Sequence, residues 1–95
     1  MTGDVVKLRE TTSNTLSSRD VGISNIFERD LPDEKGEVAP RMSAVLVIHD
    51  PDTDEVQRET VFAGNELSIG GDRYRIVTVE LGQDAPGWIS LRQVR

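Results

Sequence analysis

The stretch HDPDTDE at residues 49–55 holds the densest set of side chains that could do chemistry. Asp50, Asp52 and Asp54 repeat the D-x-D-x-D start of a calcium-binding loop, in which several oxygen ligands gather on a tight turn. Such a loop also needs a glycine and a bidentate glutamate at later positions, where this chain has glutamate and valine. The stretch therefore predicts a solvated β-turn whose aspartates bond local amides, with the three carboxylates as weak candidates for cation binding.

His49 is the single histidine of the chain, so a histidine-rich zinc site is excluded. A Ser–His–Asp hydrolase would have to use His49 as its base, and no serine lies in a G-x-S-x-G elbow. A β domain of 95 residues with 4% aromatic residues has little material for a deep pocket that shifts carboxylate pKa values. We expect no enzyme, no metal and no cofactor; the alternative is a small hydrolase or metal-dependent enzyme centred on His49.

A second group of candidates lies near the C-terminus. Residues 1–72 hold 15 acids and 7 bases, whereas residues 73–95 hold 4 arginines and 2 acids. Arg73, Arg75 and Arg92 together with Trp88 predict a surface that binds an acidic peptide or stacks on nucleic-acid bases. The alternative is that Trp88 and Tyr74 belong to the core and that the arginines are solvated.

The bulk charge limits the partners. A net charge of −6 argues against nucleic acid or an anionic membrane, because both require a basic face. The absence of cysteine fits a reducing compartment, and the first residues show neither the basic nor the apolar region of a signal peptide. We expect a soluble, cytoplasmic protein that binds a protein partner or its own copy.

The elements that position these residues are strands. Leu67 and Ile69 precede Gly70-Gly71, and β-branched residues follow at 76–79. A phosphate-binding loop needs a helix after its glycines, whereas two alternating blocks joined by glycine make a hairpin. The glycine pair is therefore predicted to be a turn.

The remaining apolar blocks are separated by four prolines, as in a sheet protein. Residues 4–10, 41–50, 55–63 and 88–95 are expected to be strands, residues 11–20 a loop or an edge strand, and residues 31–40 an exposed loop.

Residues 21–29 are ambiguous. Ile23, Ile26 and Phe27 stand at a spacing that also suits a short helix, but Gly22 and the β-branched residues favour a strand with a bulge near Asn25.

The pattern predicts one all-β domain over residues 1–95, a small antiparallel barrel or sandwich of about six short strands, with residues 1–3 and parts of 11–20 and 30–40 mobile. The predicted core consists of Val6, Leu8, Val21, Ile23, Phe27, Ala44, Leu46, Ile48, Phe62, Leu67, Ile69, Tyr74, Ile76, Val79, Ile89 and Leu91.

The stretch from Gly64 to Val94 resembles a hairpin pattern of small bacterial β-barrel domains, G-x-x-[LV]-x-[IV]-x-G-x-x-[YW]-x-[VI]. The residues that carry it are Gly64, Leu67, Ile69, Gly71, Tyr74 and Ile76. The arginine-rich, lysine-poor composition is similar to that of small proteins from high-GC bacteria such as actinobacteria, and phage head–tail joining proteins have a comparable pattern. The resemblance implies a barrel-like fold. A non-catalytic interaction module is the expected function, and a structural subunit of a phage virion or a secretion apparatus is the alternative.

Overall fold

The structure, a computed structural model, describes residues 5–10, 14–83 and 85–94, and within these ranges it contains eight strands and no helix. The strands are Val5–Arg9 (β1), Asn14–Leu16 (β2), Arg19–Pro32 (β3), Val38–His49 (β4), Val56–Phe62 (β5), Glu66–Ile69 (β6), Asp72–Glu80 (β7) and Trp88–Val94 (β8). Residues 1–3 and 11–13, which belong to the segments predicted to be mobile, lie outside the described residues. The described part of the chain has no helix that is long and apolar enough to cross a membrane.

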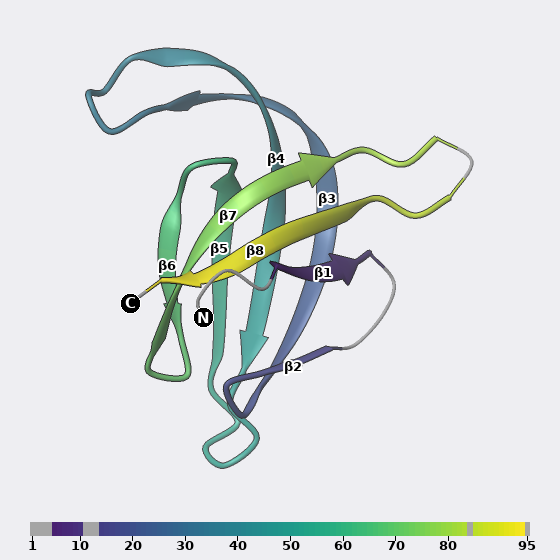
Figure 1. Cartoon of the computed structure of the whole chain (residues 1–95), viewed down its shortest axis with the longest axis vertical. Helices are drawn as coiled ribbons and strands as arrows, with labels where there is room; N and C mark the ends of the chain where they lie inside the picture. The colour runs from purple at the N-terminus through teal and green to yellow at the C-terminus, as the bar shows by residue number, and fades with distance from the viewer. Residues whose placement is uncertain (1–4, 11–13, 84, 95) are drawn as a thin grey trace.

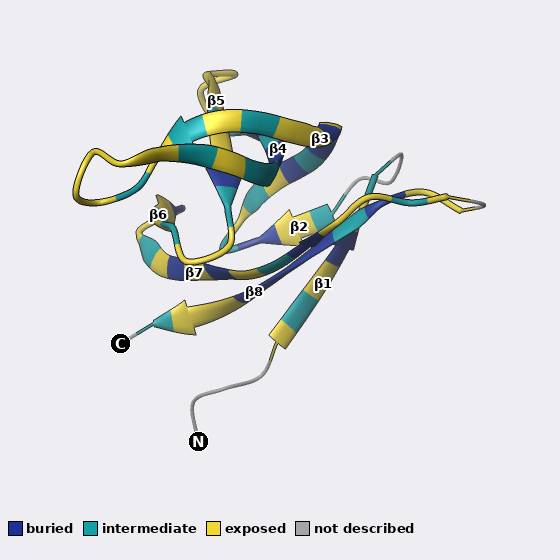
Figure 2. Cartoon of the chain, turned by 90° about the horizontal axis from the view of Figure 1, so that it is seen from above, coloured by how far each residue is buried: buried dark blue, intermediate teal, exposed yellow. Residues whose placement is uncertain are grey.

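The strands form two antiparallel sheets of four strands each (Figure 1). Sheet A has the order β1-β8-β7-β6, and sheet B has the order β2-β3-β4-β5. Seen from above, the two sheets lie as layers over one another, and buried stretches occur on β3 in one layer and on β7 and β8 in the other (Figure 2). The all-β, barrel-like fold predicted by the sequence is confirmed.

Alternating apolar residues from both sheets fill the space between the layers. The buried core consists of Leu8, Leu16, Val21, Ile23, Ile26, Ala44, Leu46, Ile48, Val61, Ile69, Tyr74, Ile76, Val79, Ile89 and Leu91. Two predicted core residues, Val6 and Leu67, are partly buried and pack against this cluster. Leu16 belongs to the core although its segment was expected to be a loop or an edge strand; the short strand β2 pairs with β3 and points it inward.

A bulge in β3 resolves the ambiguity of residues 21–29 in favour of a strand. The register between β3 and β4 shifts between Ser24 and Phe27, and Asn25 takes a positive φ of 52°. The extra residue reverses the alternation beyond it, so that Ile26 is buried and Phe27 is 49% exposed. The prediction of Phe27 as a core residue is therefore wrong.

Phe62 was also wrongly placed in the core. Val61 lies opposite the buried Ala44 and is itself only 3% exposed, so the alternation of β5 turns its neighbour Phe62 to the other face.

The prediction of an exposed loop over residues 31–40 is right for residues 33–37 and wrong for residues 31–32 and 38–40, which belong to strands. The ladder between β3 and β4 continues to the pair Pro32 and Val38, so only residues 33–37 make the turn. Asp33 closes this turn because its Oδ1 accepts the backbone N–H groups of Lys35 and Glu37 at 2.8 and 2.9 Å. Proline is tolerated here because β3 and β4 have no other strand beside them at this end. We call residues 28–42 of this hairpin the arm; it curves over the rest of the domain (Figure 1).

The glycine pair is a turn, as predicted. Gly70 and Gly71 have φ values of 60° and 90°, and they join β6 directly to β7 with no helix after them. A Cβ on Gly70 would overlap the backbone carbonyl oxygen of Ser17, whereas a Cβ on Gly71 would meet open space. The turn of one sheet therefore lies in close contact with the Ser17-Ser18 turn of the other.

Candidate functional site

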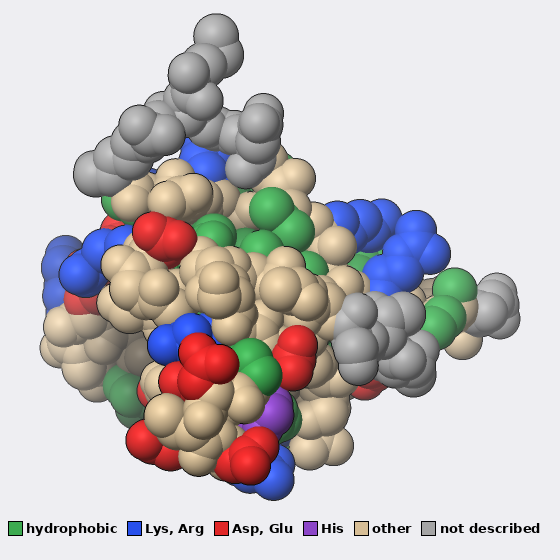
Figure 3. All heavy atoms as spheres, turned by 90° about the horizontal axis from the view of Figure 1, so that it is seen from below, with side chains coloured by type: hydrophobic (Ala, Val, Ile, Leu, Met, Phe, Trp, Pro, Cys, Tyr) green, Lys and Arg blue, Asp and Glu red, His purple; other side chains and the backbone are tan. Residues whose placement is uncertain are grey.

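Three turns meet at one end of the domain: residues 17–18 after β2, residues 50–55 after β4 and residues 70–71 after β6 (Figure 1). Seen from this end, acidic side chains gather around the single histidine (Figure 3). The turns surround an open hollow of about 340 Å³, whose lining includes Arg19, Asp50 and the glycine pair. The candidate residues at 49–55 therefore lie at the end of the domain where the three turns meet.

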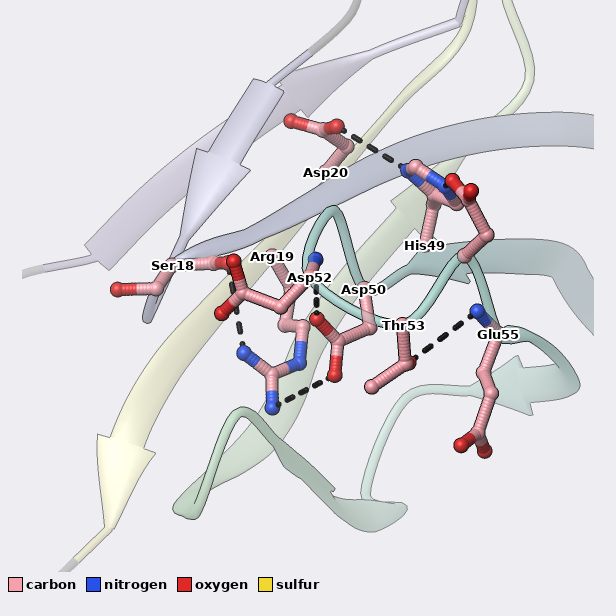
Figure 4. Close-up of polar contacts among 9 residues, drawn as sticks. Ser18, Arg19, Asp20, His49, Asp50, Asp52, Thr53 and Glu55 are labelled. Atoms are coloured by element: carbon pink, nitrogen blue, oxygen red, sulfur yellow. Dashed lines mark hydrogen bonds and ion pairs between the residues drawn. The ribbon is translucent and has the colours of Figure 1, made fainter.

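The aspartate-rich stretch forms a turn that its own backbone closes. The backbone N–H of Asp54 donates to the carbonyl of Asp50 at 2.8 Å, and that of Asp50 donates to the carbonyl of Glu55 at 2.9 Å. The Asp50 carboxylate accepts the N–H of Asp52 at 2.9 Å and pairs with Arg19 at 3.3 Å (Figure 4). These contacts, first the amide of Asp52 and then the charge of Arg19, lower the pKa of Asp50.

The three aspartates do not converge. The Asp50 carboxylate faces Arg19, whereas the Asp54 carboxylate faces His49. Among residues 5–10, 14–83 and 85–94, no group of three histidine or acidic side chains is arranged to hold a metal ion. Asp50 therefore bonds a local amide within the turn, as predicted, whereas the Asp54 carboxylate contacts His49.

His49 lies at the end of β4 between two carboxylates. Its Nδ1 is 3.3 Å from Asp20 on β3, and its Nε2 is 3.0 Å from Asp54 in the turn (Figure 4). The hydrogen bond to Asp54 and then the bond to Asp20 raise the pKa of His49, because both carboxylates stabilise the imidazolium form. Since both ring nitrogens face carboxylates, His49 would have to break one of these bonds to serve as a general base.

The predicted interaction surface lies on the outer face of sheet A. Arg75 of β7 lies directly opposite Arg92 of β8, and Arg73 follows on the same face of β7. Glu66 of β6 is the cross-strand neighbour of Arg75 and pairs with Arg75 at 2.6 Å and with Arg73 at 3.1 Å. The hydrogen bond from Arg75 and then the bond from Arg73 lower the pKa of Glu66. The structure therefore brings the three predicted arginines together.

The two aromatic residues near the arginines have different places. Tyr74 is only 5% exposed and belongs to the core, where its hydroxyl bonds the Ser17 hydroxyl at 2.8 Å. Trp88 is half-buried at the opposite end of β8 from Arg92, on the same outer face. The ammonium of Lys7 lies 4.1 Å from the centre of the Trp88 ring, which is a cation–π contact. Trp88 thus belongs to the surface, and Tyr74 does not.

Two further cations on this face were not among the candidates. Lys7 lies opposite Ser90, and Arg9 lies opposite Trp88, because β1 pairs with β8. Their alternation with apolar residues in β1 was visible in the sequence, but nothing local indicated that β1 would be placed beside a strand about 80 residues away. We call the outward-facing cations of sheet A the basic face: Lys7, Arg9, Arg73, Arg75 and Arg92.

Comparisons with models of known protein families, with curated proteins and with solved structures gave no match.

Proposed function

We propose that this domain is a non-catalytic protein-interaction module that binds an acidic segment of a partner protein through the basic face. The observation that carries the proposal is the direct cross-strand pairing of Arg75 with Arg92. Like charges placed directly opposite one another destabilise a sheet, and one carboxylate, Glu66, lies beside this pair in the same row. A destabilising arrangement on an otherwise acidic chain is typical of a surface retained for binding.

The charge distribution supports a protein partner over nucleic acid. Two carboxylates, Glu66 and Glu80, stand among the five cations of the basic face, whereas the whole chain carries a net charge of −6. The rest of the surface is therefore strongly acidic and repels a long polyanion, which extends beyond one face. A short acidic segment of a protein is small enough to contact the basic face without reaching the acidic surface around it.

Trp88 also favours a protein partner over nucleic acid. Proteins that bind single-stranded nucleic acid offer open aromatic rings on which bases stack. The Trp88 ring is covered by the Lys7 ammonium, so the ring presents a cation to an incoming partner. A cation above an aromatic ring suits a carboxylate better than a base.

The proposal is tested with a fluorescent peptide of mixed glutamate and aspartate, titrated by anisotropy at low and high salt. We expect binding that weakens as salt rises, and we expect Arg92→Glu to lower the affinity about tenfold, which corresponds to about 1.4 kcal/mol. Lys35→Glu in the arm turn makes the same change of charge away from the basic face and serves as the matched control.

Equal losses in Arg92→Glu and Lys35→Glu would show that overall charge alone attracts the peptide, and they would contradict the proposal. Tighter binding of a single-stranded oligonucleotide than of the acidic peptide would assign the basic face to nucleic acid instead.

A further inference from the structure

The two sheets leave a seam between β5 and β6. Strand β5 is the last strand of sheet B, and β6 is the last strand of sheet A, although only residues 63–65 separate them in the chain. Within the described part of the chain, no ladder joins these two strands. Asn65 bonds both the N–H and the C=O of Phe62 at the end of β5. Over the preceding residues, one edge of β5 has backbone N–H and C=O groups with which no described strand pairs.

The arm covers this seam and leaves hollows beneath it. Three hollows of about 270, 310 and 190 Å³ lie there, and Phe62 lines all three. The first and third also share Arg41 and Ala63, and the first and second share Asn65. The apolar part of their lining includes Leu31, Pro32, Met42, Leu67 and Val79. We call these three hollows together the seam groove.

Arg41 holds the arm in its curved position. Its guanidinium donates to the backbone carbonyls of Leu31 and Glu37 at 3.0 and 3.2 Å and pairs with Asp33 at 3.7 Å. The same guanidinium lies 4.8 Å from the centre of the Phe62 ring, on the floor of the seam groove. These contacts connect the roof of the groove to its floor, so the groove is formed before any ligand arrives.

We propose that the seam groove binds an extended apolar segment of a partner protein, flanked by basic residues, which adds as a strand to the free edge of β5. An unpaired edge gives main-chain hydrogen bonds to an extended peptide, and hollows along the edge accept alternate side chains. Four carboxylates line the groove, from Asp33, Glu34, Glu59 and Glu66, against the cations of Lys35 and Arg41. Asp33 pairs with Arg41, and Glu66 pairs with Arg73 and Arg75. Glu34 and Glu59 remain as an excess of acid over Lys35, which selects basic flanks on the bound segment.

This groove goes beyond the proposed function, because it favours a ligand of opposite charge and its lining contains none of the five cations of the basic face. The two sites share Glu66, which lines the groove and pairs with Arg73 and Arg75. Arg92→Glu changes neither Glu66 nor these two partners, so that variant separates the two proposals.

The test uses two synthetic peptides of alternating valine and threonine, one flanked by lysines and the other by glutamates. The isotope-labelled protein is titrated with each peptide by NMR. We expect saturable binding of the lysine-flanked peptide, with shifts centred on residues 59–67, and weaker binding of the glutamate-flanked peptide. The substitution Ala63→Trp fills the groove from an exposed position and should lower the affinity at least about tenfold. Thr53→Trp, in the exposed turn after β4, is the matched control and should bind like the unchanged protein.

Several results would overturn the proposal. These are no saturable binding of the lysine-flanked peptide, shifts confined to the outer face of sheet A, or unchanged binding by Ala63→Trp. A dimer in which two β5 edges pair, detected by sedimentation of the unchanged protein, would assign the edge to a second copy. Should Ala63→Trp fail to fold, the position of the shifts in the unchanged protein decides the question.

Discussion

Replacing each glycine of the β6–β7 turn by alanine tests how closely the two sheets approach at the turn end of the domain. Both glycines have positive φ, so alanine is strained at either position. They differ in their surroundings: a Cβ on Gly70 would overlap the carbonyl oxygen of Ser17, whereas a Cβ on Gly71 would meet nothing within 4 Å. Gly71→Ala therefore measures the backbone strain alone, and Gly70→Ala measures the strain together with the contact between the turns.

The sizes of the two effects follow from these surroundings. An alanine with positive φ lowers the free energy of unfolding by about 1–2 kcal/mol. The alanine also reduces the conformational freedom of the unfolded chain, which offsets about 0.4–1 kcal/mol of this loss. Gly71→Ala should thus lower the free energy of unfolding by about 1 kcal/mol. Gly70→Ala must also push back a backbone carbonyl, which adds about 1–3 kcal/mol, as for an overpacked core. Domains of this size are stable by about 5–14 kcal/mol, so the difference is large enough to measure.

The assay is urea unfolding followed by the fluorescence of Trp88, the single tryptophan. We expect the same dependence on urea in both variants and a lower midpoint for Gly70→Ala than for Gly71→Ala. If Gly70→Ala were as stable as Gly71→Ala, the close contact with Ser17 would not exist, and the packing of the two turns described above would be wrong.

Three further predictions concern single side chains. Ile26→Ala should lower the free energy of unfolding by about 2–5 kcal/mol and Phe27→Ala by less than about 1 kcal/mol, because the bulge buries the first and exposes the second; urea unfolding of both variants checks the order. His49 should titrate in NMR spectra above its ordinary value of 6.5, and Asp54→Asn should lower its pKa. Since the folded-state pKa is raised, the stabilisation by His49 is complete below about pH 6.5 and disappears as the pH rises through the folded-state pKa, which unfolding curves at several pH values measure. Ser17→Ala, which removes the hydroxyl that joins the first turn to β7, should cost about 1–3 kcal/mol by thermal or urea unfolding.

The parts of the fold that depend on neighbouring residues could be predicted from the sequence. The β6–β7 hairpin follows from alternating residues and a glycine pair, and the turn at residues 50–55 follows from aspartates that bond local amides. The bulge near Asn25 was also predictable, because Gly22 and the isoleucines opposed a helix.

The parts that depend on distant pairing could not be predicted. The bulge was expected, but its consequence for Phe27 depends on which residue beyond it faces the core, and only the pairing with β4 decides that. The arm was taken for a loop because its charged and proline-rich sequence lacks the pattern of a strand with one buried face. Within the described residues, no strand other than β3 pairs with residues 38–42. Lys7 and Arg9 joined the basic face only through the ladder between β1 and β8.

The ladder between β1 and β8 also affects the order in which the chain can fold during its synthesis. Residues 5–9 have residues 88–92 as their cross-strand partners in sheet A, and the Glu10 amide donates to the Gly87 carbonyl at 2.8 Å just beyond them. Strand β1 is synthesised before β8 and must therefore wait for this partner until β8 has left the ribosome. Sheet B needs only residues 14–62 and has no such delay. A nascent chain should accordingly have sheet B assembled while β1 still lacks β8.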